Sequence, residues 1–148
     1  MSQRLYFTRN EILKGRDKQA PLTPEMEQNL TRLIEAASVV REAFGKVLHV
    51  SSGYRPASIN QSVGGAAKSA HQSCEAVDLV DTDGFFANWC LNNLDILEKA
   101  GLYLEDPRYT GIFNSKGERT GGWTHLQTRP TSRRIFIPYA GVMKVQIR

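Results

Sequence analysis

A ten-residue stretch, Ser69 to Asp78, constrains the fold most, because it sets a histidine and a carboxylate seven residues apart across a loop that enters an apolar strand. In such a strand the period of two places Asp78 on one face with Ala76 and Val80. A lone carboxylate among apolar neighbours is costly to bury unless it is paired or bound to a metal. The stretch therefore predicts that His71 and Asp78 are ligands of a metal ion.

The third ligand is sought among the remaining histidines. A catalytic zinc site has three protein ligands, for which imidazole and carboxylate are well suited, and an open fourth position. The chain has three histidines in all. His49 lies in an apolar, strand-like run, whereas His125 lies in a Gly-Gly-Trp-Thr-His segment further along the chain. We therefore expect His71, Asp78 and His125 to bind one Zn²⁺ ion.

The length and composition predict one domain over residues 1–148, large enough to bury about 70% of the surface that the unfolded chain exposes. No apolar run approaches the ~20 residues of a membrane span, and the N-terminus lacks the apolar core of a signal peptide. We therefore expect synthesis in the cytoplasm. Action outside the cell that makes the protein would then require lysis, assembly into a particle or another export route.

The net charge of +4 favours anionic partners, which include nucleic acid, acidic cell-wall polymer and membrane surfaces. Nucleic acid is disfavoured because aromatic and basic residues do not interleave as they do in stacking platforms. A basic group could hold the chain near wall polymer, although an ordinary solvated face is the simpler interpretation. This group consists of Arg129, Arg133, Arg134, Lys144 and Arg148. The two cysteines, Cys74 and Cys90, are expected to be reduced thiols.

Capping patterns and periodicity predict helices early in the chain and strands towards its end. Thr8 and Glu11 form a capping box for a short helix at 9–14, and Thr23 with Pro24 opens a long amphipathic helix that ends at Gly45. Further helices are predicted at 56–63 and from 81–84 to 101, strands at 47–51, 75–80, 102–104, 123–128, 135–137 and 142–147, and a polar loop at 107–122. This order predicts an α+β fold with a mainly antiparallel sheet.

Four short motifs occur in a characteristic order: Ser51-Ser52-Gly53-Tyr54-Arg55, Ser69-x-His71, Ala76-x-Asp78 and Trp123-x-His125. Together they resemble the zinc-dependent peptidoglycan peptidases, which include D-Ala-D-Ala carboxypeptidases, vancomycin-resistance dipeptidases and phage L-alanyl-D-glutamate endolysins. The resemblance implies a hedgehog-like α+β domain in which N-terminal helices pack on the sheet. It also implies hydrolysis of a peptidoglycan stem peptide by water that zinc activates.

The resemblance also assigns roles to residues. It implies that His71, Asp78 and His125 hold zinc and that Arg55 orients the substrate through a carboxylate or carbonyl. Spacing alone is equally consistent with a solvated surface arginine at that position. Ser69 would contact either a metal ligand or the substrate.

Two positions depart from the family pattern. Cys74 stands where the family has a glycine, so a tight turn must accept a side chain, and its sulfur could also approach the metal. Gly122 stands three residues before the last histidine, where many members carry a Glu or Asp as general base. Glu105 and Asp106 end the strand expected to pair with that of His125, so either could be the base, and Glu118 is a weaker candidate.

A second function from a different class stays open. Without an acid at position 122, the chain could be a non-catalytic zinc-containing binding module or a virion structural protein with the same fold.

Overall fold

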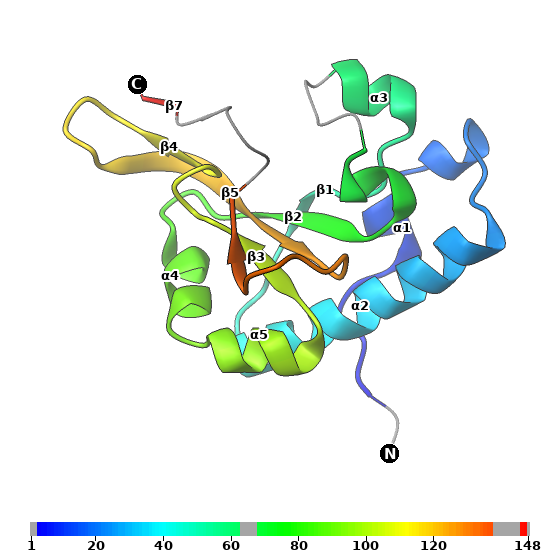
Figure 1. Ribbon diagram of the computed structural model, residues 1–148, viewed down its shortest axis with the longest axis horizontal. Coiled ribbons are helices and arrows are strands. Elements are labelled where there is room, and N and C mark those ends of the chain that lie inside the picture. The colour runs from blue at the N-terminus through cyan, green and yellow to red at the C-terminus, as the bar shows by residue number, and fades with distance from the viewer. Residues whose placement is uncertain (1–2, 63–67, 138–145, 148) are drawn as a thin grey trace.

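The computed structural model describes residues 3–62, 68–137 and 146–147, and it has an α+β architecture (Figure 1). Its helices are α1 (Arg9–Leu13), the 3₁₀ turn η1 (Arg16–Lys18), α2 (Pro24–Phe44), α3 (Ala57–Ser62), the 3₁₀ turn η2 (Ala70–Ser73), α4 (Phe85–Leu91) and α5 (Leu94–Ala100). Its strands are β1 (Val50–Ser52), β2 (Ala76–Val80), β3 (Tyr103–Glu105), β4 (Gly111–Phe113), β5 (Arg119–Gln127), β6 (Ile135–Phe136) and β7 (Gln146–Ile147).

Within the described residues, the strands form a seven-stranded sheet whose main path runs β1-β2-β5-β3-β6. Strand β4 pairs with the first half of β5, and β7 pairs with β4. The pairs β3·β6 and β4·β7 are parallel, and the other pairs are antiparallel. The predicted α+β fold with a mainly antiparallel sheet is therefore confirmed.

The two predicted N-terminal helices form for the reasons that their sequences indicate. Thr8 and Glu11 make both hydrogen bonds of the capping box at α1. At α2 the Thr23 hydroxyl accepts the amide of the third helical residue, and Gly45 ends the helix in the left-handed conformation at φ 79°. The buried stripe of α2 joins the main hydrophobic core, and α2 and α5 lie side by side under the sheet (Figure 1).

The two central strands present different chemistry on their two faces. On the face towards the helices, Val77, Leu79 and Leu126 are completely or almost completely buried in the hydrophobic core. On the opposite face Asp78 lies directly across from His125 in the antiparallel register of β2 and β5. The sheet thus covers an apolar core on one side and carries a polar cluster on the other.

The single helix predicted up to Gly101 is wrong, because the chain forms two helices, α4 and α5, with a break at Asn92 and Asn93. The Asn93 side chain donates to the carbonyl of Trp89, and that of Asn92 donates to the carbonyl of Asn88. Such side chains compete with the helix for its own backbone groups, which favours a break.

The polar loop predicted at 107–122 is also wrong over most of its length, because β4 and the first part of β5 form a hairpin there. Its turn is fixed by Asn114, whose side-chain oxygen accepts the amides of Lys116 and Glu118, and by Gly117 at φ 79°. A short apolar pair followed by an Asn-to-Gly turn was the signal for this hairpin.

The remaining elements agree with their predictions to within a few residues, and β1 begins three residues later than expected. Of the strand expected at 142–147, residues 142–145 lie outside the described part. Both cysteines are free and buried, in line with the predicted thiols. Among the described helices, none combines the length and the apolar character that crossing a membrane requires.

Candidate metal centre

Three separate segments bring His71, Asp78 and His125 together. Asp78 and His125 are direct partners on β2 and β5, and His71 lies in the turn η2 just before β2. Each of the three offers one ligand atom, and these atoms lie within 4.8 Å of one another. All three residues are less than 10% exposed. The arrangement is a set of donors that could hold one metal ion.

The turn that carries His71 is held at both of its ends. The Ser69 hydroxyl accepts the amide of His71 at the start of η2. At its end Cys74 adopts the left-handed conformation, with φ 61°. The turn is also tied to the Gly53–Arg55 segment, because the amide of Arg55 donates to the carbonyl of His71 at 3.0 Å.

The two nitrogens of His71 have different surroundings. Nδ1 lies 2.8 Å from the carbonyl oxygen of Gly53, which can only accept, so Nδ1 carries the proton. Nε2 is buried and lies 3.3 Å from Oδ1 of Asp78, yet it makes no hydrogen bond with any of the described residues. A buried nitrogen lone pair without a donor suits a metal, and the proton on the other nitrogen fixes the tautomer for that task.

His125 presents its other nitrogen to the same carboxylate. Its Nδ1 lies 2.8 Å from Oδ1 of Asp78, and its Nε2 lies 2.8 Å from Oε1 of Gln127. The ring edge also packs against Phe136, with centroids 5.9 Å apart. Nε2 of His71 and Nδ1 of His125 therefore converge on one oxygen of Asp78.

The second oxygen of Asp78 is held by Arg55. The guanidinium donates from Nη2 to Oδ2 at 2.9 Å and from Nε to the Ser52 hydroxyl at 2.9 Å. It also contacts the side-chain oxygen of Asn60 at 3.5 Å, and only 14% of the Arg55 side chain is exposed. Arg55 thus neutralises the buried carboxylate and leaves Oδ1 for the two imidazoles. The expectation that Asp78 lies among apolar neighbours is incomplete, since its own face of the sheet is polar.

The charges of the cluster follow from these contacts. Burial lowers the pKa of His71 below its ordinary value, so this ring is neutral. Burial also opposes the charge of His125, but the hydrogen bond and the charge of Asp78 outweigh it and raise the pKa of His125 to about 9. Burial alone would raise the pKa of Asp78, yet the hydrogen bond and the positive charge of His125 hold it below its usual range. A metal must therefore displace a proton from His125.

The donor set fits zinc. Two imidazole nitrogens and one carboxylate oxygen are the ligand set of a catalytic zinc site, in which the protein supplies three of the four ligands. The unbonded Nε2 of His71 is the observation that supports the fit, because a buried ring nitrogen without a partner costs free energy that a metal ligand bond would recover.

The two main candidate bases, Glu105 and Asp106, have different surroundings. Glu105 is one step along the β3·β5 ladder from the pair Leu104–Leu126, which sets it beside His125, and its charge contributes to raising the pKa of His125. Asp106 accepts three hydrogen bonds from the Arg108 side chain and one from its amide. Burial tends to raise the pKa of Asp106, but these bonds lower it below its usual value.

The weakest candidate base and the third histidine lie elsewhere. Glu118 is exposed at the tip of the β4–β5 hairpin, where it accepts a hydrogen bond from Asn114. His49 is exposed and is not part of the cluster.

The two departures from the family pattern have structural explanations. Cys74 packs its side chain into the hydrophobic core, where burial raises the pKa of its thiol to about 12. Among the described residues it is not part of the group that could hold a metal. Gly122 has φ 121°, and a Cβ there would lie 2.3 Å from the carbonyl oxygen of Thr110. An acid at this position is therefore sterically excluded in this chain.

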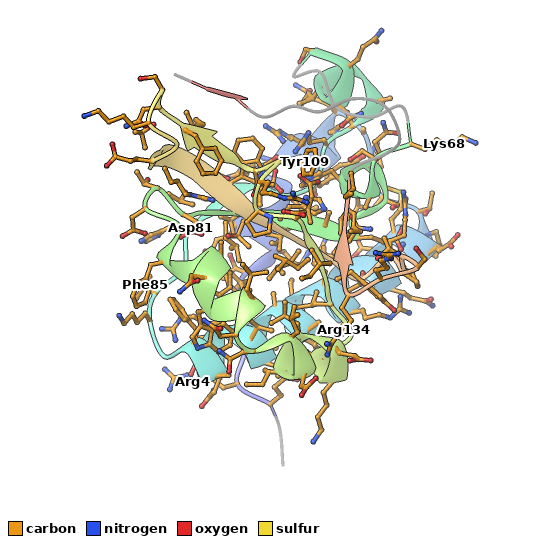
Figure 2. All side chains as sticks on the ribbon, turned by 60° about the vertical axis from the view of Figure 1, so that its left-hand side comes forward. Arg4, Lys68, Asp81, Phe85, Tyr109 and Arg134 are labelled. Atoms are coloured by element: carbon orange, nitrogen blue, oxygen red, sulfur yellow. The ribbon has the colours of Figure 1, made fainter. Side chains whose placement is uncertain are left out.

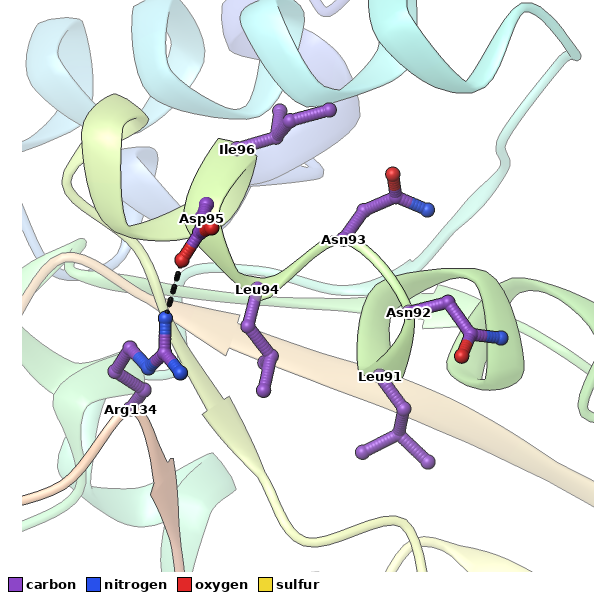
Figure 3. A pocket seen from close by; sticks show the side chains of 7 residues that line it. All are labelled: Leu91, Asn92, Asn93, Leu94, Asp95, Ile96 and Arg134. Carbon is purple, nitrogen blue, oxygen red and sulfur yellow. Dashed lines mark hydrogen bonds and ion pairs between the residues drawn. The ribbon is translucent and has the colours of Figure 1, made fainter.

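Two of the five basic residues singled out in the sequence are committed to ion pairs. Arg129 bonds to Glu75, and Arg134 bonds to Asp95 and Glu98. The Arg134 pair lies at a hollow of about 310 Å³ (Figure 3). The hollow is lined by Leu91, Asn92, Asn93, Leu94, Asp95, Ile96 and Arg134 and does not include the three candidate ligands. These contacts favour the simpler interpretation, a basic face without a dedicated binding role. Lys144 and Arg148 lie outside the described residues.

Sequence reasoning missed Gln127 and Ser52 as partners of the cluster. Gln127 follows His125 by two residues on a strand, so the period of two was the available signal for a shared face. The contact of Ser52 with Arg55 had no comparable signal, because it depends on how the chain turns after β1.

Comparison with known proteins supplies an independent result. The family described as Peptidase M15 matches residues 4–100, which is more than half of the chain. The matched segment contains Arg55, His71 and Asp78 and ends before His125. A search of curated proteins found no match. The predicted resemblance to D-Ala-D-Ala carboxypeptidase-like peptidases is confirmed, and the chain belongs to the Peptidase M15 family.

Proposed function

We propose that this chain is a zinc-dependent peptidase that hydrolyses a bond in the stem peptide of peptidoglycan, of the D-Ala-D-Ala carboxypeptidase or the L-Ala-D-Glu endopeptidase type. Membership in the Peptidase M15 family supports the reaction class. The observation that carries the proposal is the convergence of two imidazole nitrogens and one carboxylate oxygen within 4.8 Å, with one of the nitrogens buried and unbonded.

In this proposal His71, Asp78 and His125 hold the zinc. When bound, zinc supplies a Lewis acid that polarises a scissile carbonyl and lowers the pKa of water. Arg55 keeps Oδ2 of Asp78 occupied, so that Oδ1 faces the imidazoles. That Arg55 or Ser69 also contacts the substrate stays a prediction.

We further propose Glu105 as the general base, with Asp106 as the alternative. Glu105 lies beside His125 on the neighbouring strand, on the face of the sheet that carries the cluster. It would accept a proton from the attacking water and pass it to the leaving amine. Asp106 is less suited, because Arg108 stabilises its charged form and so weakens it as a base.

Metal content tests the ligand assignment. Protein purified without chelator should contain about one zinc per chain, and His71→Ala, Asp78→Ala and His125→Ala should each abolish it. His49→Ala is the matched control, because this exposed histidine lies outside the cluster and its loss should leave the zinc content unchanged. Full zinc content in any two of the three ligand variants would refute the assignment.

Digestion of purified peptidoglycan, followed by mass analysis of the products, tests the reaction. The zinc-loaded protein should release D-Ala or cut the stem peptide. Glu105→Gln should lower turnover about 10²–10⁴-fold while zinc stays bound. Asp106→Asn should have the smaller effect, and the reverse order would transfer the role of base to Asp106.

The alternative, a non-catalytic zinc-containing module or virion structural protein, has one observation in its favour. The position at which many relatives carry the base is a glycine that cannot accept a side chain. Full zinc content together with no hydrolysis of peptidoglycan would select this alternative.

A further inference from the structure

Gln127 is a buried residue at the end of β5, two positions after His125 and 7% exposed. Its side chain makes two hydrogen bonds. Oε1 lies 2.8 Å from Nε2 of His125, and Nε2 of the amide donates to the carbonyl oxygen of Arg129 at 3.0 Å. Both ends of the amide are therefore in use.

These contacts determine which way the amide points. The carbonyl oxygen of Arg129 can only accept, so the NH₂ group of Gln127 must face it. The oxygen of the amide must then face His125, and an oxygen there requires a proton on Nε2 of the ring. With the proton on Nε2, Nδ1 is the nitrogen whose lone pair can bind a metal.

We infer that Gln127 is a positioning residue that fixes the tautomer and ring orientation of His125, so that Nδ1 is presented to the metal. This inference rests on the proposed function, because it concerns the same metal centre. Hydrogen bonds of this kind to the second nitrogen of a ligating histidine set the ring orientation and raise its basicity.

The carbonyl that orients Gln127 is itself held firmly. The Arg129 guanidinium donates to Glu75, to the Ser73 hydroxyl and to the carbonyl of Lys68, all in the segment around the turn that carries His71. The neighbouring amide of Thr128 donates to the carbonyl of Glu75. Gln127 and Arg129 thus connect the two histidine-bearing segments through hydrogen bonds that do not involve the ligand atoms.

Zinc affinity measured by competition with a chromophoric chelator tests the inference. Gln127→Leu removes the acceptor at similar volume and should weaken zinc binding about 10–100-fold. Gln127→Glu keeps an acceptor for Nε2–H but loses the donor to Arg129, so its affinity should lie much closer to that of the wild type. Gln28→Leu on the exposed face of α2 is the control for the same chemical change and should bind as the wild type does.

Nitrogen-15 NMR of the zinc-loaded wild-type protein gives a second measurement that needs no variant. It should show Nε2 of His125 protonated, with slow exchange of that proton, and Nδ1 as the metal-bound nitrogen. A ring proton on Nδ1 would overturn the inference even if Gln127→Leu fails to fold. In folded Gln127→Leu, the Nε2 proton should exchange faster.

The outcomes separate this inference from the proposed function. If the wild type binds zinc and Gln127→Leu binds it equally tightly, the positioning role is wrong and the metal site stands. Equal losses of zinc affinity in Gln127→Leu and Gln127→Glu would also overturn it, because the loss of the hydrogen-bond acceptor would then not explain the effect. If the wild type binds no zinc, both fail.

Discussion

Two aspartates lie at β2, Asp78 within the strand and Asp81 just after it. Both are 5% exposed, but their carboxylates have different partners. Asp81 accepts the amides of Phe86 and Ala87 at the start of α4, and it accepts the hydroxyl of Thr124 at 2.8 Å. Figure 2 shows Asp81 on the side of Phe85 and α4, away from Lys68, which precedes the turn of His71. The Asp81 contacts tie a helix to the sheet.

Among the described residues, the carboxylate of Asp78 contacts the side chains of Arg55, His71 and His125. Backbone amides keep their protons at any ordinary pH, whereas an imidazole can exchange a proton for a metal. Nε2 of His71, near Asp78, also lacks a hydrogen bond within the described part of the chain, while both oxygens of Asp81 have donors. Burial of a carboxylate therefore does not by itself mark a functional site. The kind of donor around it does.

The largest effect is expected at Asp81. Asp81→Ala should lower the free energy of unfolding by about 3–5 kcal/mol, because it removes the cap of α4 and leaves the buried Arg119 without its nearby carboxylate. Zinc affinity of the folded fraction should not change. Chemical denaturation with parallel chelator competition measures both quantities.

Asp78→Ala is the counterpart of that experiment and should show the opposite pattern. Zinc binding should be lost, and the metal-free protein should lose less stability than Asp81→Ala does, since no helix amide loses its acceptor and His125 can give up its proton. Equal stability losses in metal-free Asp78→Ala and Asp81→Ala would show that the two carboxylates are not distinct in role.

The second-largest effect concerns Gly122, whose carbonyl accepts the amide of Asp81. Gly122→Ala should cost at least about 2 kcal/mol, because a Cβ would collide with the Thr110 carbonyl and the backbone has a positive φ. A thermal-melt series that shows wild-type stability for Gly122→Ala would reopen position 122 as a place for an acid.

A smaller effect is expected from Thr124→Val, which removes only the hydroxyl donor to Asp81. Two backbone donors remain, so the loss should be about 1–2 kcal/mol. Urea titration measures it, with Thr120→Val as the control because that threonine is exposed. A loss of stability as large as that of Asp81→Ala would mean that the Thr124 hydroxyl, and not the cap of α4, accounts for most of the stability that Asp81 contributes.

The smallest effect is expected for Cys74→Gly, within about 1 kcal/mol of the wild type. Glycine removes the strain of a left-handed backbone at φ 61°, which costs about 1–2 kcal/mol. It also removes a buried side chain whose burial contributes about 1 kcal/mol to stability. Denaturation midpoints measure the balance, and zinc content should not change. A loss of zinc in Cys74→Gly would show that this thiol supports the metal centre after all.

The sequence predicted the parts of the fold whose causes are local. The caps at Thr8 and Thr23 and the period of two around Asp78 each act within a few residues, and the structure has them where expected. Residue type and spacing together also pointed to the three donors that the structure brings together, although their role as zinc ligands stays a prediction.

The sequence could not predict contacts that depend on register between distant strands. The pairing of Arg55 with Asp78 becomes definite only once β1 and β2 are aligned. The hairpin after residue 110 was missed because its glycines and charges read as a loop, whereas Ile112 and Phe113 pair with β5.

The two histidines face Oδ1 of Asp78 through different ring nitrogens, Nε2 of His71 and Nδ1 of His125, and this difference decides which residue could replace each of them. Nδ1 sits one bond beyond Cγ, as an asparagine oxygen does, while Nε2 lies further out, about as far as a glutamine oxygen. Asparagine is therefore the natural replacement for His125, and glutamine is the natural replacement for His71. Exchanging the two replacements should leave neither amide oxygen at the position of the imidazole nitrogen that it replaces.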